Sequence, residues 1–125
     1  MKIVEFKGKK LCSGLVAYNL YKKLTGKPLQ ADAIRLSKLT KVQEKLAKGD
    51  LENVTEEELK LFDEIDFIGI VTAMYCAFRQ AAEPELRKYN LEGVIDHDGL
   101  DMDDVGSSEL TEALTELIGK EDSKK

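Results

Sequence analysis

The sequence predicts a mainly α-helical protein, a compact bundle of about five or six helices with a short N-terminal β-hairpin. Apolar residues recur at every third or fourth position along most of the chain, which is the spacing of one helix face. Capping residues and glycine or proline stops divide these stretches into segments of helical length. The connections between segments are short, so residues 1–119 are expected to form a single domain and residues 120–125 a flexible tail.

The hairpin is expected at the N-terminus. Ile3, Glu5 and Lys7 alternate with the apolar Val4 and Phe6 before Gly8 interrupts the pattern. Period-two alternation that ends at a glycine turn is typical of a β-hairpin. So small a sheet is stable only where helices cover it.

The first predicted helix follows directly. Ser13 is the expected N-cap, and Gly26 and Pro28 stop the helix after about Thr25. Its apolar stripe recurs every fourth residue, with Tyr21 beside it, and consists of Val16, Leu20 and Leu24.

The second predicted helix, residues 29–47, has an apolar face and a basic face. The apolar residues are Leu29, Ala33, Leu36, Leu39, Val42 and Leu46. The basic residues lie on the other face and are Arg35, Lys38, Lys41, Lys45 and Lys48. A solvated helix surface and a dedicated protein-binding surface both fit this pattern.

A capping box at Thr55 is the clearest local signal in the chain. Thr55 is followed three residues later by Glu58, so each side chain can accept a hydrogen bond from the backbone amide of the other. Val54 and Leu59 have the spacing of a hydrophobic staple. We therefore expect a helix that starts at Thr55 and bends or restarts near residues 63–66.

Residues 67–78 are apolar almost all the way round a helix. A helix of this kind is buried, either in the core or in an oligomer interface. Gly69 and Ala73, four positions apart, would allow another helix to approach closely. The stretch is too short to cross a bilayer, and the alternating N-terminus is unlike a signal peptide, so a soluble intracellular protein is expected.

Three further helices are predicted towards the C-terminus. Pro84 opens the first and Asn90 caps the second. The last begins near residues 101–104 and ends at Gly119. Its apolar positions are Val105, Leu110, Leu114, Leu117 and Ile118.

Charge divides the chain into a basic half and an acidic half. Residues 1–50 contain twelve Lys or Arg against four Asp or Glu, whereas residues 51–125 contain seven against twenty. The pI of about 5.0 argues against a general nucleic-acid binder, and a small regulator that binds nucleic acid through its basic half stays an alternative. Complementary potentials steer protein–protein encounters, so the split favours a protein that binds other proteins and copies of itself.

Residues 96–104 contain five carboxylates and the only histidine, His97. An EF-hand calcium loop does not fit, because its third acid and its glycine would fall on Leu100 and Asp101. A turn at Asp98 is predicted instead, and no bound metal is expected. The acids expected to cap the final helix and to interact with its dipole are Asp101, Asp103 and Asp104.

No residue pattern indicates catalysis or a cofactor, so we expect neither. Cys12 and Cys76 are far apart and lack CxxC partners, which predicts two buried apolar thiols. One histidine without a neighbouring nucleophile offers little for acid–base or nucleophilic catalysis. The tyrosines Tyr18, Tyr21 and Tyr75 fit two interpretations. They are either contact residues of a binding surface or residues at the edge of the core with the hydroxyl in water, and the second interpretation is favoured.

Four features together carry a family resemblance. They are the lysine-rich hairpin at residues 2–11, the helix that ends in Leu24-Thr25-Gly26-Lys27, the buried helix at residues 67–79 and the acidic helical end at residues 90–118. In this order they resemble the tail assembly chaperones of long-tailed bacteriophages, over most of the chain. Residues 39–53 depart from the family pattern, because this stretch is longer and more basic than is expected in the family.

The resemblance implies a non-enzymatic chaperone that binds the tape measure protein and the tail tube protein during tail assembly. Such a protein acts in the host cytoplasm, is absent from the mature virion and contacts neither nucleic acid nor membrane; in many members a ribosomal frameshift adds a second domain. We expect head-to-tail homo-oligomers that weaken as salt rises. The alternative is a structural tail or head–tail connector subunit. The candidate interaction residues are Arg35, Lys38, Lys41, Lys45, Asp101, Asp103 and Asp104.

Overall fold

A computed structural model describes residues 2–49, 51–64 and 66–122 of the chain. In this part of the chain two antiparallel strands precede seven α-helices, five of them substantial, so the predicted mainly helical fold with an N-terminal hairpin is confirmed. In chain order the elements are β1 Ile3–Phe6, β2 Lys9–Cys12, α1 Leu15–Thr25, α2 Leu29–Ala47, the 3₁₀ turn η1 Leu51–Asn53, α3 Glu56–Glu64, α4 Phe67–Ala82, the 3₁₀ turn η2 Pro84–Lys88, α5 Leu91–Asp98, α6 Met102–Val105 and α7 Ser108–Asp122.

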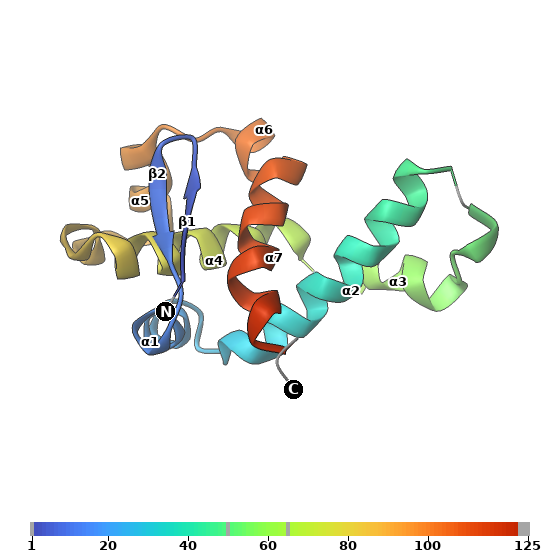
Figure 1. The fold of residues 1–125 in the computed structure, drawn as a ribbon, viewed down its shortest axis with the longest axis horizontal. Helices are drawn as coiled ribbons and strands as arrows, with labels where there is room; N and C mark the ends of the chain where they lie inside the picture. Colours follow the sequence, from blue (N-terminus) through green and yellow to red (C-terminus); the bar gives the residue numbers. More distant parts are fainter. Residues whose placement is uncertain (1, 50, 65, 123–125) are drawn as a thin grey trace.

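The hairpin is covered by helices, as so small a sheet requires. Strand β1 lies against α7 and strand β2 against α4, with Val4 paired to Leu11. Lys7 and Gly8 form the turn, with φ angles of 51° and 78°. These positive angles are those of a two-residue hairpin loop, whose twist matches the twist of the strands. Figure 1 shows the hairpin standing beside α7, with α4 passing behind both.

Helix α4 is the centre of the core. Every residue from Ile70 to Gln80 is buried except Thr72, which confirms the prediction of a helix that is buried on all sides. Asp66 caps the first turn by accepting a hydrogen bond from the Gly69 amide at 2.9 Å. A Cβ atom at residue 69 would collide with the Asp66 carboxylate. The glycine therefore serves this cap, rather than the close approach of another helix that the sequence suggested.

A buried ion pair joins α4 to α5 and to the hairpin. Arg79 donates from Nε to Asp98 Oδ2 at 2.6 Å and from Nη2 to Asp98 Oδ1 at 3.1 Å. Its Nη1 donates to the carbonyl of Lys10 on β2 at 3.0 Å. The Arg79 and Asp98 side chains are 1% and 0% exposed. One guanidinium group thus holds three elements together in the interior.

Two of the three tyrosines lie deeper in the core than the sequence predicted. Tyr21 and Tyr75 are fully buried, and their hydroxyls donate to Asp32 and Asp98, so the expected core-edge position with the hydroxyl in water is wrong for both. Burial, and then the hydrogen bond to Asp98, raises the pKa of Tyr75 above its usual range, which keeps the hydroxyl protonated as a donor. Tyr18 is half-buried.

The start of α1 also differs from the prediction. Ser13 does not cap the helix, because its hydroxyl accepts from a backbone amide next to β1 at 3.0 Å and Gly14 occupies the cap position. Val16, which was expected in the core stripe, is 49% exposed. The buried residues of α1 are instead Ala17 and Tyr21. The buried face is therefore rotated by one position from the predicted face.

The predicted final helix is in fact two helices. Asp101 and Asp104 form a capping box around the four-residue α6, and this helix ends at Gly106. Ser107 then caps α7, since its hydroxyl accepts from the Leu110 amide at 3.2 Å. The acids were expected to cap the long C-terminal helix, but they cap α6.

The C-terminal end of α7 lies beyond the predicted boundary. The helix passes the expected stop at Gly119 and continues to Asp122, so residues 120–122 of the predicted tail are helical. The rest of that tail, residues 123–125, lies outside the described residues.

We predict that Asp98→Asn lowers the free energy of unfolding at pH 7 by about 3 kcal/mol, because Arg79 loses its buried counter-charge and keeps only the half-exposed carboxylate of Glu83, at 3.3 Å. Urea denaturation followed by circular dichroism measures the change. Asp96→Asn is the matched control, since Asp96 is an exposed carboxylate on the same helix, and it should change stability by less than about 0.5 kcal/mol. Equal losses in the two variants would contradict the role assigned to the ion pair.

The same loss has a defined pH dependence. Burial alone would raise the pKa of Asp98, but hydrogen bonds from Arg79, Tyr75 and His97 outweigh burial and lower this pKa to about 2. The value in the unfolded chain is about 3.9. Ionised Asp98 therefore stabilises the folded state above about pH 4, and this contribution disappears as the pH falls towards about 2. The stability difference between wild type and Asp98→Asn should shrink over the same interval.

Candidate protein-binding site

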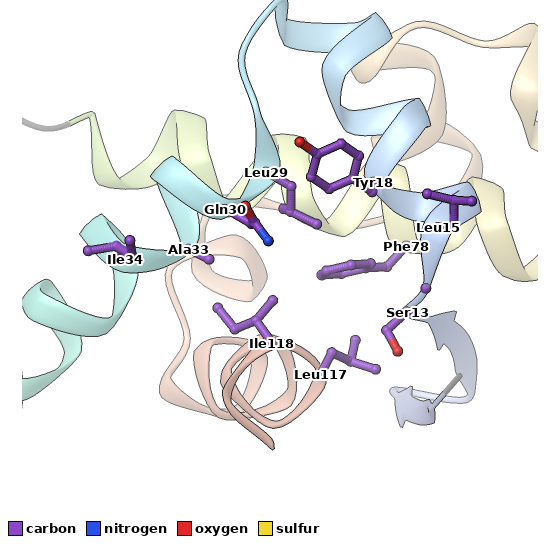
Figure 2. Close-up of a pocket in the computed structure, with 11 residues that line it drawn as sticks. Ser13, Leu15, Tyr18, Leu29, Gln30, Ala33, Ile34, Phe78, Leu117 and Ile118 are labelled. Carbon is purple, nitrogen blue, oxygen red and sulfur yellow. The ribbon is translucent and has the colours of Figure 1, made fainter. Parts of the chain in front are cut away.

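An open groove with a mainly apolar lining lies between α1, α2 and α7. Its volume is about 510 Å³. Phe78 on α4 is fully buried and forms the base of the groove. Figure 2 shows its ring between the side chains of α1 and α2 on one side and those of α7 on the other. The apolar wall residues are Leu15, Tyr18, Leu29, Ala33, Ile34, Leu117 and Ile118.

Exposed apolar side chains stand at the rim of this groove. Leu15 is 75% exposed and Ile34 is 56% exposed. Single exposed apolar residues are ordinary on a protein surface, but two of them beside one mainly apolar, concave surface fit a contact site. The groove can therefore bury apolar side chains of a partner while the core beneath it stays packed.

A second buried polar cluster joins the two helical walls. Asp32, whose side chain is 4% exposed, accepts from the Tyr21 hydroxyl on α1 and from Arg35 Nη1 at 2.6 Å. Burial, and then the hydrogen bond to Asp32, raises the pKa of Tyr21 above its usual range. The predicted stop at Gly26 is confirmed, with a φ of 75° and its amide donating to the Lys22 carbonyl at 2.7 Å. Together these contacts hold α1 and α2 at a defined angle.

The four predicted basic interaction residues lie along α2, and two of them are already paired. Arg35 pairs with the buried Asp32, and Lys45 pairs with a glutamate of α3 at 3.1 Å. Lys38 and Lys41 are exposed and make no hydrogen bond or ion pair with a described residue. Only these two of the four keep their charge available for a partner.

Lys45 holds α3 against α2. Its partner Glu58 belongs to the predicted capping box, which is confirmed: the Thr55 amide donates to Glu58 at 3.0 Å, and the Glu58 amide donates to Thr55 at 3.1 Å. Hydrogen bonds from Thr55 and then from Lys45 lower the pKa of the Glu58 carboxyl. In Figure 1 the second half of α2 and α3 extend away from the rest of the molecule as an arm. The predicted break is also confirmed, since α3 ends at Glu64 and α4 begins at Phe67.

The three predicted acidic residues lie at α6, away from the arm in Figure 1, so the structure does not bring the basic and the acidic sets together. Asp101 and Asp104 cap α6, and Asp104 also pairs with Lys7 at the hairpin turn. The hydrogen bond from Lys7 lowers the pKa of the Asp104 carboxyl. Asp103 is exposed and makes no hydrogen bond or ion pair with a described residue.

Between described residues, three ion pairs connect the basic half of the chain to its acidic half within one molecule. They join Lys7 to Asp104, Lys2 to Glu116 and Lys45 to Glu58. The first two attach the hairpin region to α6 and α7, and the Lys45–Glu58 pair holds α3 against α2 in the arm. Part of the charge division therefore serves the fold, which leaves fewer charges for contacts between copies.

The acidic run near His97 is dispersed by the fold. Asp98 points into the core, while Asp101 and Asp104 face the α6 backbone. Among the described residues, no group of three or more His, Cys, Asp or Glu side chains is arranged to hold a metal ion. Cys12 and Cys76 are both buried, as predicted, and burial raises the pKa of the Cys76 thiol to about 12.

The sequence contains a signal for the groove that the pattern of core positions does not include. Residues 15–17 of α1 are three consecutive apolar positions, and one face of a helix cannot bury all of them. In α2, Ile34 adjoins the predicted core position Ala33 but lies outside the stripe of three-to-four spacing. Such surplus apolar residues on two adjacent helices indicate a second, exposed apolar surface.

Comparisons with models of protein families, with curated proteins and with solved structures find no match. In the described residues, no helix combines the length and the apolar character that crossing a membrane requires.

We predict that Tyr21→Phe lowers the free energy of unfolding by about 1–3 kcal/mol, because the buried Asp32 carboxylate loses one of its hydrogen-bond donors. Tyr18→Phe is the matched control: it makes the same change on the same helix, at a hydroxyl without a hydrogen bond to a described residue. Urea denaturation should show less than about 0.5 kcal/mol for this control. If both variants lose the same stability, the cluster does not hold the two walls together.

Proposed function

We propose that this protein is a tail assembly chaperone of a long-tailed bacteriophage, which binds the tape measure protein and the tail tube protein without catalysing a reaction. The observation that carries the proposal is the open apolar groove between α1, α2 and α7. A chaperone of this kind needs an accessible apolar surface, because the client segments it shields are those that would otherwise aggregate. The order of elements supports the same function through the family resemblance. The protein acts in the host cytoplasm and is absent from the mature virion.

The sheet content favours the chaperone over a structural tail or connector subunit. Ring-forming tail subunits need extended sheet for stacking, whereas the sheet in the described residues is one hairpin with four residues in each strand. Both strands are covered by helices of the same chain.

The same proposal includes self-association of the chain, with fewer charged residues available for contacts between copies than the sequence suggested. Arg35, Lys45 and Asp104 are already paired within the chain. Lys38 and Lys41 on α2, together with the acidic surface at α6, supply the opposite charges for contacts between copies. Because the two surfaces differ, such contacts are head-to-tail and extend into rings or open spirals around a client.

We predict that coexpression with this protein keeps the tape measure protein of the same phage in the soluble fraction, and that Ile34→Glu abolishes this effect. The substitution places a charge where the client would bury apolar side chains, and desolvating that charge opposes binding. Quantitative immunoblotting of the tape measure protein in supernatant and pellet measures the effect. Leu46→Glu is the matched control, since Leu46 is also an exposed apolar residue of α2 but lies outside the groove.

Two results would reject the chaperone. One is a tape measure protein that stays equally insoluble with and without the wild-type chain. The other comes from mass spectrometry of purified virions: this chain in stoichiometric amounts would identify a structural subunit.

A further inference from the structure

We infer that each of the two surfaces proposed for self-association carries an opposite charge from its own chain, Lys7 at α6 and Glu57 beside the lysines of α2. These two internal counter-charges weaken contacts between free copies, so that copies assemble on a client and not in its absence. The inference rests on the proposed function, because it concerns the regulation of the self-association proposed there.

Lys7 places a positive charge on the acidic surface at α6. Residues 101–118 contain six carboxylates and no Lys or Arg. The Lys7 ammonium group reaches this surface from the hairpin turn and pairs with Asp104. The hydrogen bond to Asp104 raises the pKa of Lys7, and the nearby charges of Asp101 and Glu109 raise it further. Lysines of another copy that approach α6 would therefore meet a like charge, which opposes the contact.

The turn does not favour a lysine at this position, and the fold gains little from it. Lys7 has a φ of 51° in a hairpin loop, where Asn, Asp and Gly are preferred. Its side chain is 50% exposed, and ion pairs of exposed lysines contribute little to stability. The α6 cap does not need Lys7, because Asp104 accepts from the Asp101 amide through Oδ2 at 3.1 Å and contacts Lys7 through Oδ1. An uncommon backbone conformation that stability does not explain points to a functional role.

Glu57 has the corresponding place on the basic surface of α2. Lys38 and Lys41 line an open hollow of about 310 Å³ together with Glu57 and Glu58. Glu58 is held by Lys45 at 3.1 Å, whereas Glu57 is exposed and makes no ion pair with a described residue. The Glu57 carboxylate therefore reduces the attraction of the two free lysines for carboxylates of another copy.

A shared client overcomes both counter-charges. Copies that are bound to one client have an effective concentration for each other on the order of millimolar. Contacts that are too weak to form between dilute free copies can form between such neighbours. The internal charges thus make assembly depend on the client.

The test measures the self-association of the full chain by sedimentation equilibrium at about 0.1 M salt. Lys7→Asn removes the charge at α6 and supplies a residue that tolerates a positive φ angle, and Glu57→Gln removes the charge at α2. Each substitution should raise the association constant about threefold, the effect of one exposed charge pair. The gain should shrink at about 1 M salt, where the Debye length falls to about 3 Å. Lys7→Asn makes the net charge more negative and Glu57→Gln makes it less negative, so an increase in both cannot come from net charge.

Two controls make the same charge changes elsewhere. Lys2→Asn matches Lys7→Asn, because Lys2 is also a lysine of the hairpin region but pairs with Glu116 on α7. Glu56→Gln matches Glu57→Gln, because Glu56 is the preceding exposed residue of α3 and lies outside the hollow. Both controls should leave the association constant unchanged. Circular dichroism checks that each variant is folded.

Three outcomes would overturn the inference. Unchanged or weaker association of either folded variant would show that its charge does not oppose the contact. Opposite effects of the two variants would show that net charge controls association. A chain that stays monomeric in every variant would remove the self-association and the inference with it. Coexpression with the tape measure protein is measured separately, so the chaperone proposal can hold where this inference fails.

Discussion

The buried ion pair between Arg79 and Asp98 is the contact on which the rest of this structure depends. It ties α4 to α5, and through the Lys10 carbonyl it also ties α4 to the hairpin. Taking both charges out of water is expensive, so the pair stabilises the fold only when each partner is in place. Phe78, at the base of the groove, directly precedes Arg79 on α4. An arrangement that satisfies the ion pair therefore also places the base of the candidate site.

The sequence-based predictions that the structure confirms depend on residues that are neighbours in the sequence. The Thr55 cap and the Asn90 cap, which accepts from the Gly93 amide at 2.8 Å, each involve residues three positions apart. The Gly26 stop needs only a positive φ angle. In contrast, Asp98 meets Arg79 across 19 positions, and no local pattern indicates that a carboxylate beside a turn will point into the core. The rotation of α1 has the same origin, because tertiary packing decides which face is buried. The break between α6 and α7 had local signals, since Gly106 ends α6 and Ser107 caps α7.

The candidate site was only partly predictable for a related reason. The basic and acidic residues were visible in the sequence, but the fold pairs Arg35, Lys45 and Asp104 internally. The groove depends on apolar residues that stay exposed, and composition alone does not separate these from core residues. A surplus of apolar positions on two adjacent helices was the available signal. The opposite charges of the two halves thus form ion pairs within one molecule. The charged side chains on α1, α2 and α6 that are not paired in this way are available to partners.

The central claim is that the protein acts by holding a client segment between α1, α2 and α7. Hydrogen exchange of the full chain, alone and in a soluble complex with the tape measure protein, tests it most directly. The account predicts that binding slows exchange around residues 15–18, 29–34 and 114–118, which border the groove. Slower exchange confined to α6 or to the arm, with the groove unchanged, would contradict it.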